Sequence, residues 1–410
     1  MNEVVITGLG VVSPSGVGKR QFWANIKFGR SFISKIERFD ASLYRSHIAG
    51  VVKGMDTYTH LSERLLKKID LFSHMALVAS EAALTDANID MQNENKDRTG
   101  IFMGNAIGGW LYAETELRDL YLEGREGVSP YMASAWFPAA PQGQISIYYE
   151  IKGYSKTVVS DRASSLQAIG YARKVLKQNK LDLILAGGME APVTPYALLC
   201  CNTSGVLSDG NDSPQTAYKP FDKDRNGFAI GEGSGVLILE SLERAKKRNA
   251  QIYAKILGFA TNCDGVDRIK PDINGAGLAA AIELALKDAN VTPDEIDYIC
   301  ADGAATYEAD ISETRAIKKV FKDRAKKIPV SAPKAMFGNL LGASGAVDTI
   351  STILAMQNNL APATINYQTP DPECDLDYVP NQARETKIDK ALIISRGRGG
   401  INAVLVLGKV

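Results

Sequence analysis

The sequence predicts an α/β fold composed of two similar halves. Segments with the pattern of buried strands alternate with segments of helical periodicity, which is typical of sheets covered by helices on both faces. The alternation starts again near residue 252, and the glycine turn and strand at 231–239 have a counterpart at 392–407. We therefore expect an internal duplication, with one half over residues 1–250, the other over 251–410, and mainly parallel sheets.

Each half is a succession of short strands and amphipathic helices. In the first half we expect strands at 4–12, 99–104, 158–159, 181–188 and 236–239, and helices at 62–88, 114–120, 163–178 and 241–249. In the second half we expect a strand after 252, a helix at 278–290, a strand at 296–301, a helix at 311–321, and strands at 392–400 and 403–407. Gly8 and Gly10 resemble the start of a dinucleotide-binding turn, but Ser13 stands at the third glycine place, so we expect a tight turn there.

Composition and charge indicate an ordinary globular protein. Of its 410 residues, 45% are hydrophobic and 23% are charged, and 47 Lys and Arg balance 47 Asp and Glu, so no excess charge favours nucleic acid or a membrane surface as a partner. No apolar run approaches the roughly 18 residues of a membrane-spanning helix. Met1 leads directly into a strand pattern, so we expect no signal peptide and a cytoplasmic location.

The cysteines and histidines limit the available chemistry. The five cysteines, Cys200, Cys201, Cys263, Cys300 and Cys374, are scattered without metal-ligand spacing, which indicates a reducing compartment and no metal site. The pair Cys200 and Cys201 follows an apolar run, so we expect it to be buried packing. The histidines are His47, His60 and His74, so any mechanism with a Ser–His or Cys–His pair must use the first fifth of the chain.

A strand, a sharp polar turn and a helix follow one another at 158–172. Such a turn can hold a nucleophile at the N-terminus of a helix, where negative charge is favoured. Here Arg162 stands at the apex of the turn. A guanidinium is permanently charged and cannot attack a carbonyl, and its charge opposes the helix dipole unless an anion lies beside it. The sequence thus predicts the frame of a nucleophile site without the nucleophile.

The turn resembles the active-site turn of the β-ketoacyl synthases, condensing enzymes of the thiolase superfamily. Their turn is similar to Thr-Ala-Cys-Ala-Ser-Ser-Leu-Gln-Ala-Ile, and residues 163–169 match it closely, which places Arg162 where the family has its catalytic Cys. The resemblance covers essentially the whole chain. It implies the thiolase fold, a five-layered αβαβα sandwich formed by two duplicated halves.

The same resemblance places two catalytic histidines of the family at altered positions. The family segment similar to Ala-His-Gly-Thr-Gly-Thr corresponds to 301–306, which puts Asp302 at the first His, and the segment after Lys334 puts Asn339 at the second. The sites at 160–166, 302 and 339 are therefore expected to be degenerate, with no catalytic residue. Framework residues of the family are kept at Lys334, Asp348, Gly399 and Gly400, and Lys334 and Asp348 could form an ion pair. We also expect Arg162 to pair with Asp302, and Asn339 to hydrogen-bond one of them.

A more specific resemblance is to the chain-length factors, the ketosynthase β-subunits of type II polyketide synthases. The run at 128–137, which ends in Ala-Trp-Phe, and the segment Gly-Gln-Ile-Ser-Ile at 143–147 are similar to that group. It implies a dimer and tunnel segment at 105–147, in which the chain length would be set by Trp110, Ala113, Leu117, Trp136 and Phe137. Core or dimer packing remains an alternative for each of these side chains.

Two features depart from the chain-length-factor pattern, at Arg162 and at Ser164-Ser165, and a third, at Arg396 and Arg398, departs from active synthases. Those subunits usually carry Gln at the nucleophile place, and a guanidinium cannot replace a neutral amide in decarboxylation. Ser164 and Ser165 resemble active synthases rather than the Gly-Gly of chain-length factors. Arg396 and Arg398 stand where active synthases have gating phenylalanines, so either a blocked acyl gate or simple solvent exposure accounts for them.

The resemblance implies a non-catalytic subunit that forms a heterodimer, or a higher assembly, with an active ketosynthase. Its partner would condense malonyl units carried on the phosphopantetheine of an acyl carrier protein in polyketide biosynthesis, and this chain would need no cofactor of its own. Two alternatives remain open. The chain could be an independent acyltransferase or thioesterase that uses Ser160, Ser164 or Ser165 with His74, or a homodimeric binding or scaffold protein.

Overall fold

A single large mixed sheet of eleven strands forms the centre of the protein. The computed structural model describes residues 3–55 and 61–410. The strands of this sheet are β1 (Val4–Ser13), β2 (Gly16–Val17), β5 (Thr99–Gly104), β6 (Lys156–Val158), β7 (Leu183–Glu190), β9 (Gly233–Ser241), β10 (Ala254–Cys263), β11 (Tyr298–Cys300), β12 (Val330–Ser331), β15 (Lys390–Gly397) and β16 (Ile401–Gly408). Two small sheets contain β3 (Ile33–Lys35), β4 (Ile48–Gly50) and β8 (Ile230–Gly231), and β13 (Leu360–Ala361) and β14 (Arg384–Glu385).

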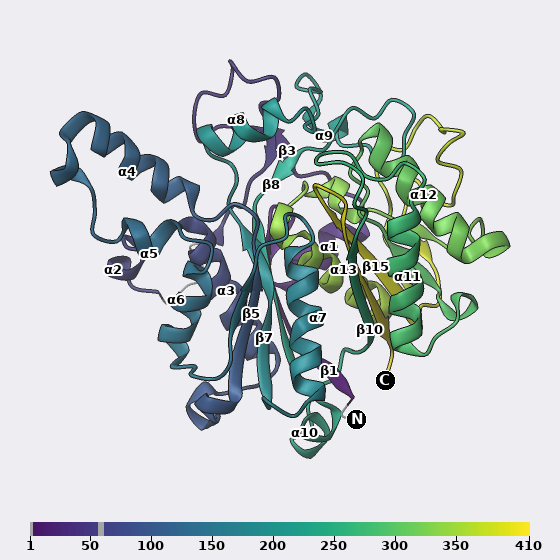
Figure 1. The fold of residues 1–410 in the computed structure, drawn as a ribbon, viewed down its shortest axis with the longest axis horizontal. Helices are drawn as coiled ribbons and strands as arrows, with labels where there is room; N and C mark the ends of the chain where they lie inside the picture. The colour runs from purple at the N-terminus through teal and green to yellow at the C-terminus, as the bar shows by residue number, and fades with distance from the viewer. Residues whose placement is uncertain (1–2, 56–60) are drawn as a thin grey trace.

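The helices surround and divide this sheet (Figure 1). They are α1 (Lys19–Lys27), α2 (Glu63–Leu66), α3 (Leu71–Asp86), α4 (Trp110–Glu123), α5 (Met132–Trp136), α6 (Ala140–Tyr149), α7 (Ser164–Lys177), α8 (Pro195–Thr203), α9 (Pro214–Ala217), α10 (Leu242–Lys247), α11 (Ala276–Ala289), α12 (Tyr307–Phe321) and α13 (Ser344–Asn358). None of the helices in the described ranges is both long and apolar enough to cross a bilayer.

The predicted duplication is confirmed by the order of the strands. The sheet runs β12-β11-β15-β16-β10-β1-β9-β7-β5-β6. From the centre outward, the first half has the order β1-β9-β7-β5-β6 and the second half the order β10-β16-β15-β11-β12. Corresponding strands of the two halves occupy the same places and run in the same relative directions. The two first strands, β1 and β10, pair antiparallel and join the halves. A sequence-level repeat of strand and helix patterns thus corresponds to a repeat of topology.

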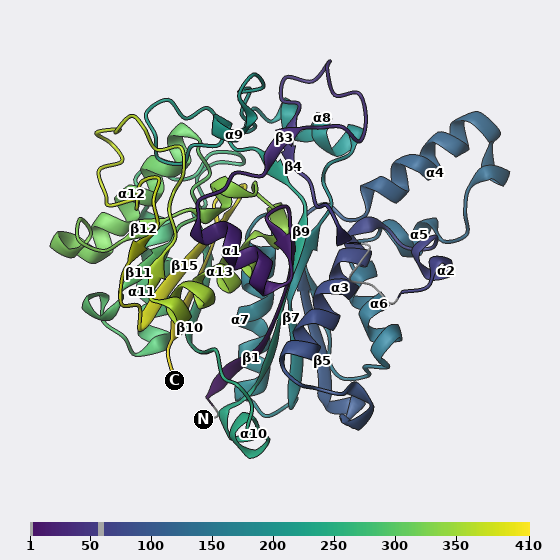
Figure 2. The ribbon, with the colours of Figure 1, turned by 180° about the vertical axis from the view of Figure 1, so that it is seen from behind.

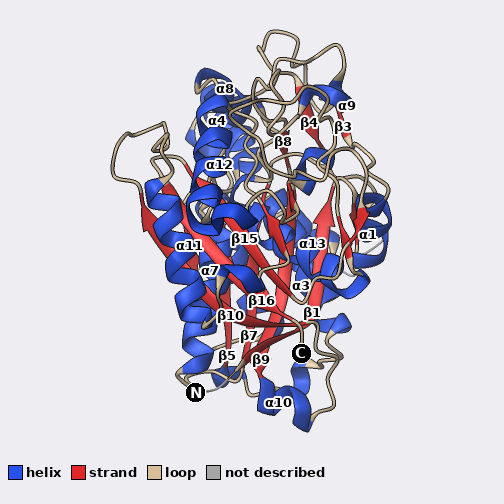
Figure 3. Cartoon of the chain, turned by 90° about the vertical axis from the view of Figure 1, so that its right-hand side faces the viewer, coloured by secondary structure: helices blue, strands red, loops and turns tan. Residues whose placement is uncertain are grey.

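The layers alternate between helix and sheet, as the fold class predicts. Helix α3 packs on β1 and β9 on one outer side, and α11 packs on β10 and β16 on the other. Helices α7 and α13 contact each other and strands of both halves, so they form the central helical layer. Figure 3 shows strands running between helices on both sides. Apolar side chains fill the three helix-containing layers as three separate clusters, which accounts for the nearly continuous burial of the long strands.

The prediction of mainly parallel sheets is wrong. In the large sheet, β9 is antiparallel to both of its neighbours, and β15 and β16 form a hairpin. Parallel pairs in that sheet are β5 with β6 and β7, and β11 with β12 and β15. In a small sheet, β4 and β8 are also parallel. The hairpin connection leaves no room for the crossover helix that a parallel pair requires. Burial of both faces therefore reflects the helical layers and not the strand directions.

The expected helix at 62–88 is divided into α2 and α3. The Asp70 side chain accepts a hydrogen bond from the backbone N–H of Phe72 and thereby caps α3. Asp70 also accepts one from Tyr112 N at the start of α4, 2.7 Å away. A capping carboxylate inside an apolar-periodic stretch ends one helix and starts the next. The same side chain fixes the base of α4, which projects away from the body of the protein in Figures 1 and 2.

Candidate functional site

The turn before α7 presents Arg162 to a cavity, as the sequence predicts. The turn places Asp161 in the left-handed region (φ 50°), and α7 begins two residues after Arg162, at Ser164. The Arg162 side chain is 13% exposed, and its Nε donates to the carbonyl oxygen of Arg396 at 2.8 Å. Its guanidinium carbon lies 5.6 Å from the centre of the Phe228 ring. The cation is thus held in place by a hydrogen bond to the second half of the chain and by an aromatic ring of the first half.

The expected pairing of Arg162 with Asp302 is present in the structure. Asp302 follows β11 and is buried, and its Oδ2 lies 3.8 Å from Arg162 Nη2. The other oxygen, Oδ1, accepts from the backbone N–H of Arg396 and lies 3.9 Å from Lys334 Nζ. Burial lowers the pKa of Arg162, but the charges of Asp302 and Asp161 outweigh it and raise the pKa above its ordinary value. Arg162 is therefore a cation at any physiological pH.

The predicted hydrogen bond from Asn339 to this pair is wrong. The Asn339 Oδ1 accepts from Leu341 N at 3.0 Å and from Ser344 Oγ at 3.2 Å. These bonds turn its carbonyl toward the start of α13 and fix the glycine-containing turn at 341–343. The sequence placed Asn339 in the correct region, but a short side chain in a turn commonly satisfies its own backbone first.

Lys334 and Asp348 form the ion pair that the sequence indicated. Their Nζ and Oδ2 atoms are 2.7 Å apart, and both side chains are fully buried. Burial raises the pKa of Asp348 to about 6, against the opposing charge of Lys334. For Lys334, burial lowers the pKa, but Asp348 and Asp302 together raise it above its ordinary range. Lys334 thus lies between two carboxylates, and Asp302 between two cations.

The glycines at 399 and 400 form the hairpin turn between β15 and β16. Both have positive φ values, 75° and 77°, which side chains rarely adopt. At Gly400 a Cβ atom would also lie 2.6 Å from the Cβ of Asp264. These two glycines therefore set the position of the preceding residues, Arg396 and Arg398, at the edge of the site.

Glu190 is a buried site residue that the sequence analysis did not identify. At the end of β7, its carboxylate accepts three backbone N–H groups, those of Ala106, Ile107 and Gly342. Burial raises the pKa of Glu190 to about 8, although the three N–H donors act in the opposite direction. An acidic residue that ends an otherwise apolar strand was the available signal. Glu190 joins the segment after β5 in the first half to the turn before α13 in the second.

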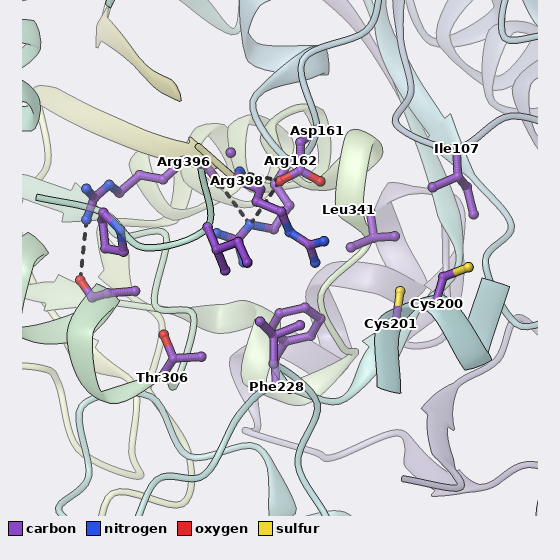
Figure 4. A pocket seen from close by; sticks show the side chains of 15 residues that line it. Ile107, Asp161, Arg162, Cys200, Cys201, Phe228, Thr306, Leu341, Arg396 and Arg398 are labelled. Atoms are coloured by element: carbon purple, nitrogen blue, oxygen red, sulfur yellow. Dashed lines mark hydrogen bonds and ion pairs between the residues drawn. The ribbon is translucent and has the colours of Figure 1, made fainter. Parts of the chain in front are cut away.

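The cavity next to Arg162 has a volume of about 280 Å³. Its walls include Phe228, Leu341, Arg398 and the cysteine pair of α8. Figure 4 shows Cys200 and Cys201 at the end of the cavity near Ile107, away from Thr306. The expectation that both cysteines are buried packing is wrong, because Cys200 is exposed and Cys201 is half-buried. Helix α8 packs its other face, with Ala197 and Leu198, into the protein.

The predicted tunnel residues lie on α4, on α5 and directly after α5, and three of them form an aromatic group. The ring of Trp110 lies 6.2 Å from that of Trp136, which in turn lies 6.0 Å from Phe137. Trp110 also contacts the ring of Tyr196 at 4.6 Å. Ala113 is buried, whereas Leu117 and Phe137 are 37% and 55% exposed. The five side chains therefore share one region, and two of them face outward from this chain.

The serine residues of the turn do not have the surroundings of a nucleophile. Ser164 and Ser165 are fully buried, and Ser160 Oγ donates to Gln167 Oε1 at 2.9 Å. His74 lies on α3, which covers the opposite face of the sheet from α7, as Figures 1 and 2 show. His60 lies outside the described residues. Among the described residues, no three His, Cys, Asp or Glu side chains are grouped so that they could hold a metal ion.

Comparison with known proteins identifies the family. The family model for the N-terminal domain of β-ketoacyl synthases matches residues 1–245, and the model for the C-terminal domain matches residues 253–368. The chain belongs to the β-ketoacyl synthase family. It is 40% identical over 408 residues to a 3-oxoacyl-[acyl-carrier-protein] synthase 2 of Coxiella burnetii, which covers 100% of this chain and 99% of the relative. A synthase 2 of Synechocystis is 39% identical over 407 residues, with 99% and 98% covered.

Solved structures of the family have the same fold. One is described as "AntDE:AntF (apo): type II PKS acyl-carrier protein in complex with its ketosynthase bound to the hexaketide" (TM-score 0.92, 34% identity, 100% of this chain and 99% of that chain covered). Another is "The ishigamide ketosynthase/chain length factor" (TM-score 0.93, 31% identity, 100% and 99% covered). A β-ketoacyl synthase from Burkholderia phymatum gives a TM-score of 0.93 at 31% identity, with both chains fully covered. The thiolase fold predicted from the sequence is thus confirmed.

Replacing Asp302 by Asn should destabilise the protein strongly. The substitution keeps the shape of the side chain but leaves the buried Arg162 without its nearest carboxylate, and we expect a loss of about 3 kcal/mol in the free energy of unfolding. Urea denaturation measures the change. As a matched control, Asp182→Asn breaks the partly exposed pair with Arg98 (2.7 Å) and should cost less than about 1 kcal/mol. Equal losses in the two variants would contradict a buried ion pair at Arg162.

Stability should fall as the pH rises through the pKa of Glu190. The pKa of this group is about 8 in the folded protein and near 4.5 in the unfolded chain, so between these values the folded state binds more protons. Its stabilising contribution is complete below about pH 4.5 and is lost as the pH passes 8. In urea titrations from pH 6 to 9, Glu190→Gln should therefore lose less stability than the unmodified protein. In the control Glu385→Gln, at an exposed position, the free energy of unfolding should depend on pH as in the unmodified protein. The same pH dependence in Glu190→Gln would contradict a raised pKa at Glu190.

Proposed function

We propose that this chain is the non-catalytic chain-length-factor subunit of a ketosynthase pair. The proposal rests on the residue at the apex of the nucleophile turn. This residue is Arg162, which is held by a hydrogen bond to the Arg396 carbonyl and by an ion pair with Asp302. A guanidinium held in this way can neither attack a thioester nor act as a base. An active ketosynthase partner would supply the complete reaction centre.

Positions in the turn beyond Arg162 also disfavour chemistry on this chain. The backbone N–H of Arg398 faces the same site, but it already donates to Asp161 Oδ2 at 2.6 Å. A donor occupied by a carboxylate is not available to stabilise an oxyanion. The Oδ1 atoms of Asp302 and Asn339 already accept hydrogen bonds from backbone N–H groups of Arg396 and Leu341.

Two outer features of the chain support a protein partner. Strand β6 is the last strand of the sheet, so its outer edge is open to pairing with another chain, and Val159 and Tyr154 beside it are each 55% exposed. Helix α4 projects from the body, with Tyr121 86% and Leu122 70% exposed (Figure 2). Exposed apolar side chains on a projecting helix and an open sheet edge are both features that protein interfaces use.

The aromatic group at the base of α4 would form part of the tunnel for the growing chain. Trp110, Trp136 and Phe137 contact one another in series, and Leu117 lies further along the same helix as Trp110. Since Phe137 and Leu117 face outward, a partner covering this region would enclose a cavity between the two subunits. The size of these side chains, together with the small Ala113, would then limit product length.

The substrates of the pair would be malonyl and acyl groups on the phosphopantetheine of an acyl carrier protein, in polyketide biosynthesis. The structural relatives support this choice, because one is described as a ketosynthase in complex with its acyl carrier protein and another as a ketosynthase with a chain-length factor. The sequence relatives from Coxiella burnetii and Synechocystis are named as 3-oxoacyl-[acyl-carrier-protein] synthases, so the inactive role rests on the residues of this chain. The subunit would require no cofactor of its own and would act in the cytoplasm.

The complex can be tested directly by co-expression with an active ketosynthase. We expect the two chains to co-purify, and condensation of malonyl groups to require both. Changing the catalytic Cys of the partner to Ala should abolish condensation, since this chain offers no nucleophile. Intact-protein mass spectrometry of this chain alone, after incubation with an acyl thioester, should show no acyl adduct. An adduct would favour the serine acyltransferase, and a stable homodimer that does not bind the ketosynthase would favour the scaffold.

Within the complex, Trp110→Ala should lengthen the product. Removal of the indole opens space between Trp136 and Tyr196, so the chain can undergo one or more additional condensation cycles before it meets the end of the tunnel. Mass spectrometry of the released products measures their length. Leu284→Ala, a substitution at a half-exposed position on α11 in the other outer layer, serves as the control and should leave the length distribution unchanged. Identical products from both variants would contradict a tunnel at Trp110.

A further inference from the structure

The cavity beside Arg162 combines apolar walls with a group of guanidinium side chains. It is lined by Arg162, Arg396 and Arg398, and its apolar walls are Ile107, Val206, Phe228, Ile269 and Leu341. Among the described residues that line it, Asp161 is the one carboxylate. Figure 4 shows the arginines on one side of the cavity and the Phe228 ring on the other. Such a cavity is shaped for a small molecule with an apolar body and a negative end.

The three guanidinium groups differ in how many ion pairs and hydrogen bonds they make within the protein. Arg396 is 3% exposed and directs its Nη2 to Asp264, 3.3 Å away. Arg162 has Asp302 at 3.8 Å, beyond hydrogen-bond distance, and its two Nη atoms donate no hydrogen bond to the described residues. The guanidinium of Arg398 makes neither an ion pair nor a hydrogen bond within residues 3–55 and 61–410. The lining thus contains one cation without a partner and a second whose terminal donors are unused.

We propose that this cavity is a binding site for a small monocarboxylate with an apolar body, its carboxylate held by Arg398 and Arg162. The inference rests on the proposed function, because a reactive centre at the turn would exclude a resident ligand. A guanidinium presents parallel N–H donors that match the two oxygens of a carboxylate. The apolar body would lie against Phe228, Val206 and Ile269.

The charges around the cavity favour a single negative charge on the ligand. Arg162, Arg396 and Lys334 each have a carboxylate at ion-pair distance, those of Asp302, Asp264 and Asp348. Among the described lining residues, Arg398 is the cation that has no carboxylate at ion-pair distance. A second negative charge would face Asp161, whose carboxylate lies in the same lining, and would be disfavoured. The volume of about 280 Å³ limits the body to a small group.

Calorimetric titration with hexanoate, hexanamide and acetate tests this site. The full chain is used, or its complex with the ketosynthase if the chain is purified in that form. Hexanoate should bind about ten- to a hundred-fold more tightly than hexanamide, which has the same body but no charge. Acetate, which lacks the body, should bind more weakly than hexanoate. Equal affinities for the acid and its amide would overturn the proposal.

Variants at the cavity locate the binding. Arg398 is exposed, so Arg398→Gln should fold normally and should lower the affinity for hexanoate about tenfold or more. Ile269→Ser, a change at a 60% exposed wall residue, should weaken hexanoate binding but leave acetate unaffected. Arg20→Gln, in a separate groove near α1, is the matched control and should bind as the unmodified protein does. Unchanged binding in Arg398→Gln would refute the site.

The binding experiment can contradict the ligand site without contradicting the proposed function of the chain. In the complex, the partner could itself bind hexanoate, but only the difference between the unmodified subunit and Arg398→Gln reports on this cavity. Co-purification and condensation measure the role of the subunit and do not require hexanoate. A complex that condenses malonyl groups but shows no Arg398-dependent binding would remove the ligand site and leave the subunit role intact.

Discussion

A line of alternating buried charges, Arg162, Asp302, Lys334 and Asp348, connects the two halves of this protein. Consecutive members lie 3.8, 3.9 and 2.7 Å apart. Each internal member has opposite charges on two sides, so the cost of removing any one from water is offset by two neighbours. Deletion of one member would leave the others uncompensated in a low-dielectric interior. The arrangement therefore makes the site a structural junction, whatever chemistry it serves.

The duplicated topology explains why residues so distant in sequence meet at this point. The turn with Arg162 connects β6 to α7 in the first half, and Asp302 follows β11, the second strand of the other half. Helices α7 and α13 pack together in the central layer. Lys334 lies in the short turn at 333–336 that precedes α13 and reaches Asp348 in the first turns of that helix. Arg396 at the end of β15 closes the group through its backbone, since its carbonyl accepts from Arg162 and its N–H donates to Asp302. One residue thus holds both members of the pair.

Much of the fold and part of the site could be predicted from the sequence. The duplication followed from repeated strand and helix patterns, and the charge of Arg162 was enough to require an anion near it, which Asp302 provides. Strand direction could not be predicted, because the hairpin between β15 and β16 and the crossovers leave similar apolar patterns. Glu190 was missed because its partners are backbone N–H groups, which have no sequence signature. The exposure of Cys200 was not predicted, because the apolar residues before it suggested a buried segment. In the short helix α8, Ala197 and Leu198 are buried, whereas Cys200 is exposed.

This site differs from a reactive ketosynthase site by more than the absence of a nucleophile, because the groups around position 162 are also changed or occupied. A cation before the N-terminus of α7 opposes the helix dipole, and it is tolerated because Asp302 and Asp161 lie within 4.0 Å of it. Asp161 in turn occupies the backbone N–H of Arg398, and Asp302 occupies that of Arg396. A thiol introduced at 162 alone would face a buried carboxylate, Asp302, whose negative charge disfavours the thiolate. The surrounding groups are therefore matched to a cation at the apex and not to a thiolate, so restoring a reactive centre would require changes at several positions and not at 162 alone.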